Sequence, residues 1–192
     1  MTALDGPSAP QTRMLLASDG STTTLLQALL GEELELRLDG VDVRTGGDVA
    51  EAARAALGID EDASVLVRRS ALVTGAGVEV SRNRVVASAL ASDVIGRVLT
   101  GAKPIGTIMN GRRAGHHRIP LESGWSWWDP AGARLPCAFK AYVIVEDGTP
   151  AIHVFERFNP RFIPTAGYPM VPLHVARGGL VDSTATEWRG GR

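Results

Sequence analysis

The chain has 192 residues, of which 44% are apolar and 21% are charged, a composition typical of one soluble globular domain. A net charge of −1 argues against a nucleic-acid partner, and the single cysteine, Cys137, excludes an internal disulfide and fits a reducing cytoplasm. No apolar stretch approaches the roughly 20 residues that span a membrane, and the N-terminus lacks the pattern of a signal peptide. We therefore expect a cytoplasmic protein that binds neither nucleic acid nor membranes.

The chain is predicted to begin with a loose tail and a capped helix. Residues 1–12 are polar and contain proline, so we expect a flexible tail before an ordered domain over residues 13–175. Asp19-Gly20-Ser21 is typical of a turn that enters a helix, with Ser21 or Thr22 as the N-cap. Free backbone N–H groups at such a helix start can bind an anion, although most bind water.

Alternating apolar and polar residues predict three hairpins, over residues 33–43, 64–86 and 137–158. The first and the third contain an Asp-Gly pair, which is typical of a tight turn between two strands. The pairs are Asp39-Gly40 and Asp147-Gly148. A short helix is expected over residues 48–57.

The segment between the second and third hairpins is harder to interpret. Residues 88–99 have helical periodicity, and Pro104-Ile105-Gly106 is predicted to start a second short helix. Residues 111–124 are basic and irregular, so we expect a mobile loop or lid. His116-His117 has no further ligand at useful spacing, which favours a surface pair over a metal site. Residues 176–192 are polar and Gly-rich and are expected to be disordered.

Glu156 is the first candidate for chemistry. Period-2 alternation places it on one strand face with Ile152 and Val154. A carboxylate in such a place is costly to desolvate, and burial would raise its pKa into the range of a useful acid or base. An edge-strand glutamate, or one paired with an arginine, is the alternative interpretation. The strand alone favours the alternative.

Arg68 and Arg69 are the second candidate. Adjacent residues of a strand point to opposite faces of the sheet, so one of the two guanidinium groups faces an apolar layer and needs an anionic partner there. That partner is either Glu156, in a structural ion pair, or the carboxylate of a substrate held by two hydrogen bonds. The pattern leaves both open.

The order and spacing of four short motifs resemble those of the chorismate pyruvate-lyase family, over roughly residues 14–164. The motifs are residues 15–24 (LLASDGSTTT), the Arg68-Arg69 strand, residues 103–106 (KPIG) and residues 155–160 (FERFNP). This resemblance implies an α+β fold, with a single six-stranded antiparallel sheet and helices packed on one face around a small closed ligand cavity. The related UTRA-like fold also serves as the ligand-sensing domain of some transcription regulators.

The resemblance also implies roles for residues. A strand arginine, matched by Arg68 or Arg69, would bind the ring carboxylate; Arg68 is favoured because it shares a face with Leu66 and Leu72. Helix-start amides that match Thr22 and Ile105, the latter beside Gly106, would assist. Glu156 would move a proton while pyruvate leaves chorismate to give 4-hydroxybenzoate or an isomer. No metal or redox cofactor is required, because aromatisation drives the reaction.

Two alternatives stay open beside this carbon–oxygen lyase. Relatives often have a larger apolar residue in place of Thr22 and a pair of arginines in place of Lys140-Ala141, and residues 111–136 do not align with the family. The departures at Thr22 and over residues 111–136 favour a same-fold dehydratase or cyclase for another enolic or polyketide-like substrate. The second alternative is a non-catalytic small-molecule sensor. Sensors of this fold usually carry a DNA-binding winged helix before the domain, and a tail of residues 1–12 leaves no room for one.

Overall fold

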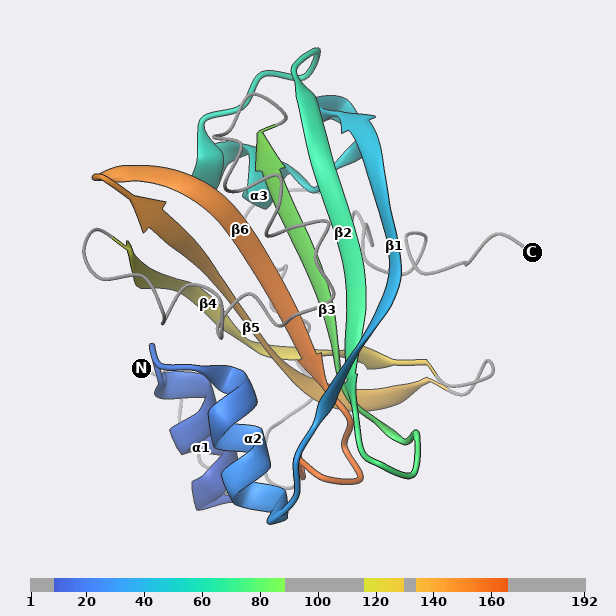
Figure 1. The fold of residues 1–192 in the computed structure, drawn as a ribbon. Coiled ribbons are helices and arrows are strands. Elements are labelled where there is room, and N and C mark those ends of the chain that lie inside the picture. Colours follow the sequence, from blue (N-terminus) through green and yellow to red (C-terminus); the bar gives the residue numbers. More distant parts are fainter. Residues whose placement is uncertain (1–8, 89–115, 130–133, 166–192) are drawn as a thin grey trace.

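The structure, a computed structural model, describes residues 9–88, 116–129 and 134–165 (Figure 1). Six strands form one antiparallel sheet in the order β1-β2-β3-β6-β5-β4. The strands are β1 (Glu35–Thr45), β2 (Ser64–Val73), β3 (Glu79–Ser88), β4 (His116–Trp128), β5 (Leu135–Glu146) and β6 (Thr149–Phe158). The helices are α1 (Pro10–Ala17), α2 (Thr22–Leu30) and α3 (Glu51–Leu57), with a 3-10 turn, η1 (Gly46–Asp48), before α3. The predicted α+β fold with a six-stranded antiparallel sheet is confirmed.

The predicted start of α2 is confirmed as well. The Oγ of Ser21 accepts a hydrogen bond from the backbone N–H of Thr24, as an N-cap residue does. Helix α1, however, begins at Pro10, inside the segment predicted as a tail. Proline suits the first turn of a helix, and the buried Thr12 donates a hydrogen bond of 2.9 Å to the carbonyl of Pro164. This contact ties the start of α1 to the chain that follows β6.

The predicted hairpin at Asp39-Gly40 is wrong. β1 runs straight through this pair and stays hydrogen-bonded to β2, with only a shift of register between Leu38 and Gly40. The dipeptide therefore forms a bulge, which takes up one extra residue while the ladder continues on both sides. The other Asp-Gly pair does form a hairpin turn, since Asp147 and Gly148 both have positive φ (50° and 82°), as a type I′ turn requires.

The lid predicted over residues 111–124 is wrong from residue 116 onward. His116 to Trp128 form β4, an edge strand paired with β5 and interrupted by a bulge between Pro120 and Glu122. An edge strand tolerates proline and charged residues, because only one of its sides must complete a ladder of hydrogen bonds. The helix predicted over residues 88–99 lies outside the described residues except for Ser88, which ends β3. The helix predicted from Pro104 and the tail predicted over 176–192 lie wholly outside them.

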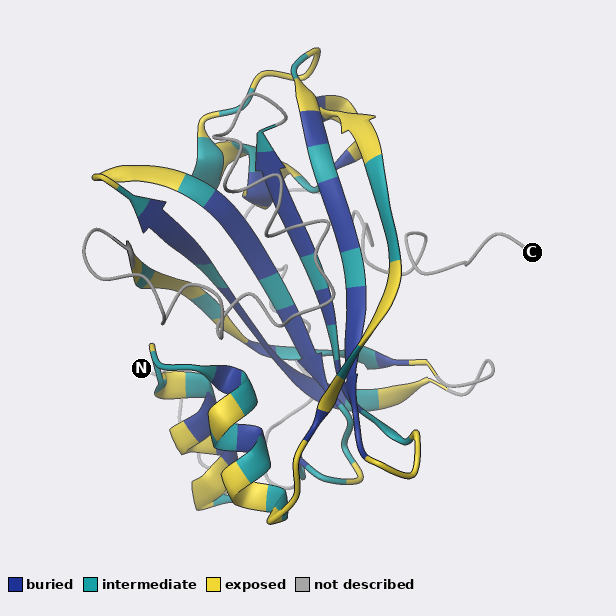
Figure 2. Ribbon diagram, viewed as in Figure 1, coloured by how far each residue is buried: buried dark blue, intermediate teal, exposed yellow. Residues whose placement is uncertain are grey.

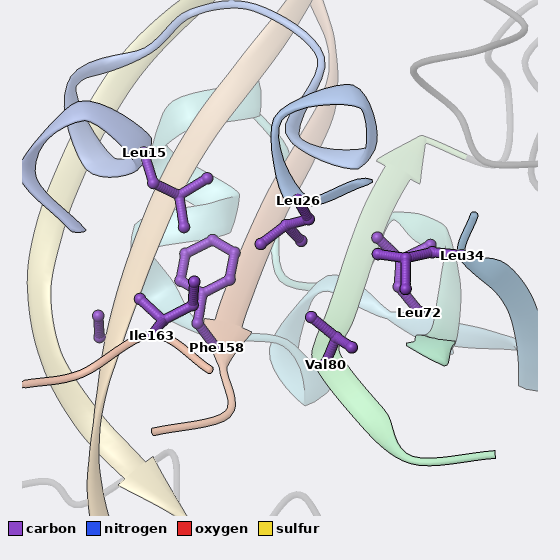
Figure 3. Packing of buried hydrophobic residues seen from close by; sticks show 8 residues of the cluster. Leu15, Leu26, Leu34, Leu72, Val80, Phe158 and Ile163 are labelled. Carbon is purple, nitrogen blue, oxygen red and sulfur yellow. The ribbon is translucent and has the colours of Figure 1, made fainter. Parts of the chain in front are cut away.

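The two faces of the sheet are covered by different helices. α1 and α2 pack on one face, where Leu15 and Leu26 meet Phe158 of β6 (Figure 3). α3 packs on the opposite face, against Val65 and other valines of β2 and β3. The central strands are accordingly mostly buried, whereas the edge strand β1 is largely exposed (Figure 2). Within the described part of the chain, no helix is long and apolar enough to cross a membrane.

Candidate functional site

A small polar cavity lies between the N-terminus of α2 and the sheet. Its volume is about 40 Å³, enough for about three water-sized groups. Ser21, Thr22 and Thr23 line it from the helix side. We call it the inner cavity.

The sheet side of the inner cavity is built by two adjacent rows of side chains that run across the strands. One row places Glu156 of β6 between Asn83 of β3 and Lys140 of β5. The other row begins with Arg68 of β2 and passes through Val85 and Val154 to Tyr142 of β5. Residues that are paired across strands point to the same face, so the antiparallel register gathers groups that lie far apart in the sequence.

Glu156 is buried, with 6% of its surface exposed, and is held by three neighbours. The hydroxyl of Thr22 donates a hydrogen bond of 2.7 Å to Oε2, and the hydroxyl of Tyr142 lies 3.3 Å from Oε1 as a second donor. The Nζ of Lys140 lies 4.0 Å from Oε2. Burial raises the pKa of Glu156 above its ordinary value, while the charge of Lys140 opposes this rise.

Lys140 connects the carboxyl group of Glu156 to the turn between α1 and α2. Its Nζ donates hydrogen bonds to the carbonyls of Leu15 (3.2 Å) and Ser18 (3.3 Å). The side chain is buried, and this burial lowers the pKa of the ammonium, against the favourable charge of Glu156. A buried cation stays charged only where such partners compensate for lost water. Lys140 therefore contacts both the turn between α1 and α2 and the carboxyl group of Glu156.

The two adjacent arginines have separate environments. Arg68 is fully buried and lines the inner cavity, and burial lowers the pKa of its guanidinium. Arg69 lies on the opposite face, where its Nη2 pairs with Asp42 Oδ2 at 2.5 Å. The sequence had left open which of the two faces the cavity, and the register of β2 places Arg68 there.

The structure thus brings together three of the predicted site residues, Thr22, Arg68 and Glu156, around one cavity. Arg69 is not part of it, and Ile105 and Gly106 lie outside the described residues. Two further lining residues, Arg118 and Tyr142, were missed. Alternation along β5 could have found Tyr142, which shares a face with Lys140; Arg118 was hidden because its segment was interpreted as a loop.

The charges of the inner cavity favour an anionic ligand. Two guanidinium groups, those of Arg68 and Arg118, line it together with the first residues of α2. The free N–H groups at a helix N-terminus attract negative charge. Glu156 is the opposing acid, and the Nζ of Lys140, 4.0 Å from its Oε2, balances its charge. Among residues 9–88, 116–129 and 134–165, no three His, Cys, Asp or Glu side chains gather as a metal site.

Comparison with known proteins gives relatives by structure alone: no family model and no curated protein matches the sequence. The effector domain of PhnF from Mycobacterium smegmatis is similar with a TM-score of 0.58 at 18% identity, over 75% of this chain and 91% of that one. A second PhnF structure gives a TM-score of 0.59 at 18% identity, over 77% of this chain and 67% of that one. These likenesses show the fold.

A third similar structure is the ligand-binding domain of a protein from Bordetella bronchiseptica that is described as a GntR-family transcriptional regulator. Its TM-score is 0.50 at 8% identity, over 72% of this chain and 88% of that one. The fold is therefore UTRA-like, as the resemblance implied.

Two predictions are corrected by these comparisons. The prediction of a carbon–oxygen lyase is wrong, since the similar structures are effector and ligand-binding domains, including one from a transcriptional regulator. The prediction that nucleic acid is no partner is wrong for the same reason, because regulators of transcription act with DNA.

His153, on the other face of β6, leads to a prediction about pH. It is buried, and burial together with the charge of Arg84 lowers its pKa from 6.5 to about 4. Between these values the unfolded chain binds a proton that the folded protein does not, so the free energy of unfolding falls as the pH falls from 6.5 to 4. The loss is at most roughly 3 kcal/mol, from about 1.4 kcal/mol per pKa unit.

The measurement is urea unfolding at pH 4 to 7 of the wild type and of His153→Leu. Glu156 acts with the opposite sign, because its raised pKa makes the folded state gain its proton first as the pH falls. The wild type and the variant share Glu156, so the difference between their two pH profiles isolates His153. Parallel profiles for the two proteins would contradict the assignment.

Proposed function

We propose that this domain senses a small acid for a regulator of transcription, and that the inner cavity binds the acid group. The observation that carries this proposal is the fully buried guanidinium of Arg68 at a cavity that also faces the start of α2. The likeness to effector and ligand-binding domains supports it. A carboxylate or phosphate would accept hydrogen bonds from Arg68 and from the amides of Thr22 and Thr23.

The same contacts suggest how binding would be transmitted. Thr22 lies at the first turn of α2 and holds Glu156, while Lys140 holds the turn that precedes this helix. An anion beside Arg68 would add contacts to the helix start and alter the charge balance at Glu156. The ligand would thereby favour one position of α1 and α2 over another. A DNA-binding domain or partner in the cytoplasm would read this position.

The test is thermal unfolding and calorimetric titration of the purified protein with inorganic phosphate, acetate and succinate at constant ionic strength. Acetamide serves as the uncharged control for acetate. A specific anion at 100 times its dissociation constant stabilises the folded state by about 2.7 kcal/mol. We therefore expect at least one anion to raise the melting temperature and acetamide to leave it unchanged. The proposal fails if all anions act no more strongly than sodium chloride.

A further inference from the structure

A second cavity adjoins the inner cavity. It lies between the turn after α1 and strands β4 and β5, and its volume is about 140 Å³, enough for about ten water-sized groups. Ser18, Asp19, Glu122 and Lys140 are among its lining residues. We call it the outer cavity.

Two side chains separate the outer cavity from the inner one. Within the described part of the chain, Arg118 and Tyr142 are the residues that line both. The guanidinium carbon of Arg118 lies 5.9 Å from the centre of the Tyr142 ring, and its Nη1 donates a hydrogen bond of 3.3 Å to the carbonyl of Asp19. The partition thus consists of side chains, and the long arginine can change rotamer without moving a strand.

The Nε–H of Arg118 is a further hydrogen-bond donor at this partition. Its Nε is buried and has no hydrogen-bond acceptor among the residues that the structure describes. A buried donor without an acceptor is unfavourable, so a ligand atom that accepts a hydrogen bond from this N–H would be stabilised here. This N–H lies on the side chain that borders both cavities, where a ligand extending from one to the other would pass.

The charges of the outer cavity indicate what such a ligand would place there. Two acidic residues, Asp19 and Glu122, are balanced by the cations of Arg118 and Lys140. A second charged group on the ligand would be repelled by the two acidic residues if it were negative and by the two basic residues if it were positive. Uncharged hydroxyl or amide groups can donate to the carboxylates and accept from the cations, so they suit this lining better.

We propose that the two cavities form one binding site for a small acid with a hydroxyl- or amide-bearing body. The inner cavity holds the acid group, the outer cavity holds the body, and Arg118 donates hydrogen bonds to the ligand between them. This inference rests on the proposed function, because it assumes that the inner cavity binds the acid group. It adds the chemical class of the ligand and a residue that selects it.

The experiment compares three probes of equal head group by calorimetry: inorganic phosphate, propyl phosphate and glycerol 3-phosphate. The latter two have bodies of similar length, and only glycerol 3-phosphate carries hydroxyl groups. We expect glycerol 3-phosphate to bind about tenfold more tightly than either of the others, as one hydrogen bond to a charged group allows. Acetate, butyrate and 3,4-dihydroxybutyrate repeat the comparison with a carboxylate head.

Arg118→Lys tests the role of the arginine, because it keeps the charge and removes the Nε donor. We expect it to reduce the advantage of the hydroxylated probe to less than about threefold while the head group alone still binds. Arg161→Lys is the matched control, since Arg161 is exposed and lines neither cavity. An advantage that survives in Arg118→Lys overturns the role of Arg118.

The outcomes separate this inference from the proposed function. If phosphate or acetate binds but the hydroxylated probes bind no better than the apolar ones, the two-part site is wrong and the anion sensor stands. If neither head group binds in any probe, the anion sensor is wrong and the two-part site falls with it.

Discussion

Replacing Arg68 with methionine is expected to weaken anion binding by about 100-fold. The guanidinium is fully buried at the inner cavity, so a bound acid group would lose a charged partner that water cannot replace. Losing one partner of a buried charge pair costs roughly 2–5 kcal/mol, and each 1.4 kcal/mol is tenfold in affinity. The measurement is calorimetric titration of both proteins with the anion that binds the wild type most tightly.

The neighbouring arginine supplies the control for this experiment. Arg69→Met removes the same charge from the same strand, but from the opposite face, where Arg69 pairs with Asp42. It should leave affinity within about threefold, since Arg69 is half-buried on the far face of the sheet, its charge is paired with Asp42, and salt screens what remains at long range. Methionine has a volume close to that of the arginine stem, and circular dichroism and melting temperature confirm that each variant is folded. Equal losses in both variants would show that general charge, and not the cavity, binds the anion.

The second large effect is expected at Glu156. Glu156→Ala should lower the free energy of unfolding by about 3–5 kcal/mol at pH 7, because it leaves the buried ammonium of Lys140 without its acidic partner. The loss should shrink as the pH rises through the pKa of Lys140 in the variant, which is lowered further because the charge of Glu156 no longer opposes the effect of burial. Above that pKa the folded state no longer holds the proton, whereas the unfolded chain still does. Urea unfolding over a pH series measures both effects.

A double-mutant cycle assigns this loss to the pair. In the background of Lys140→Met, the change Glu156→Ala should cost at least 1 kcal/mol less, roughly the coupling seen for residues in contact. Thr22→Val is the milder control, since it removes only the hydrogen bond of 2.7 Å to Oε2 and should cost about 1 kcal/mol. Additive effects of the two variants would falsify the coupling between Lys140 and Glu156.

Local patterns were sufficient where a segment depends mainly on its own residues. The cap at Ser21, the turn at Asp147-Gly148 and the face shared by Ile152, Val154 and Glu156 follow from side-chain chemistry and from the two-residue period of a strand. The same reasoning failed at Asp39-Gly40. A turn dipeptide forms a bulge when both flanking runs pair with the same neighbouring strand, and that neighbour lies outside the local window.

The candidate site could be predicted only in part for a related reason. Glu156 and Arg68 stood out because a charged residue among apolar ones violates the expected pattern. Arg118 did not, because its strand carries proline, glycine and charges that only an edge strand tolerates. The resemblance in sequence motifs pointed to a lyase, but one fold can serve different functions, so motifs that accompany the fold do not decide whether a reaction takes place.

The sequence by itself determined most of the strands, the cap of α2 and the place of the Glu156 carboxyl on an apolar strand face, because each depends on neighbours within a few residues. The α+β class followed from the resemblance of four motifs to a known family. Only the tertiary structure decided that Arg68, and not Arg69, faces the cavity, and that Lys140 is the ammonium beside Glu156. It also decided that Arg118 and Tyr142 stand between two cavities. These facts depend on strand order, on register and on the packing of α2 against the sheet, which bring together residues far apart in the sequence, such as Thr22 and Glu156, 134 positions apart.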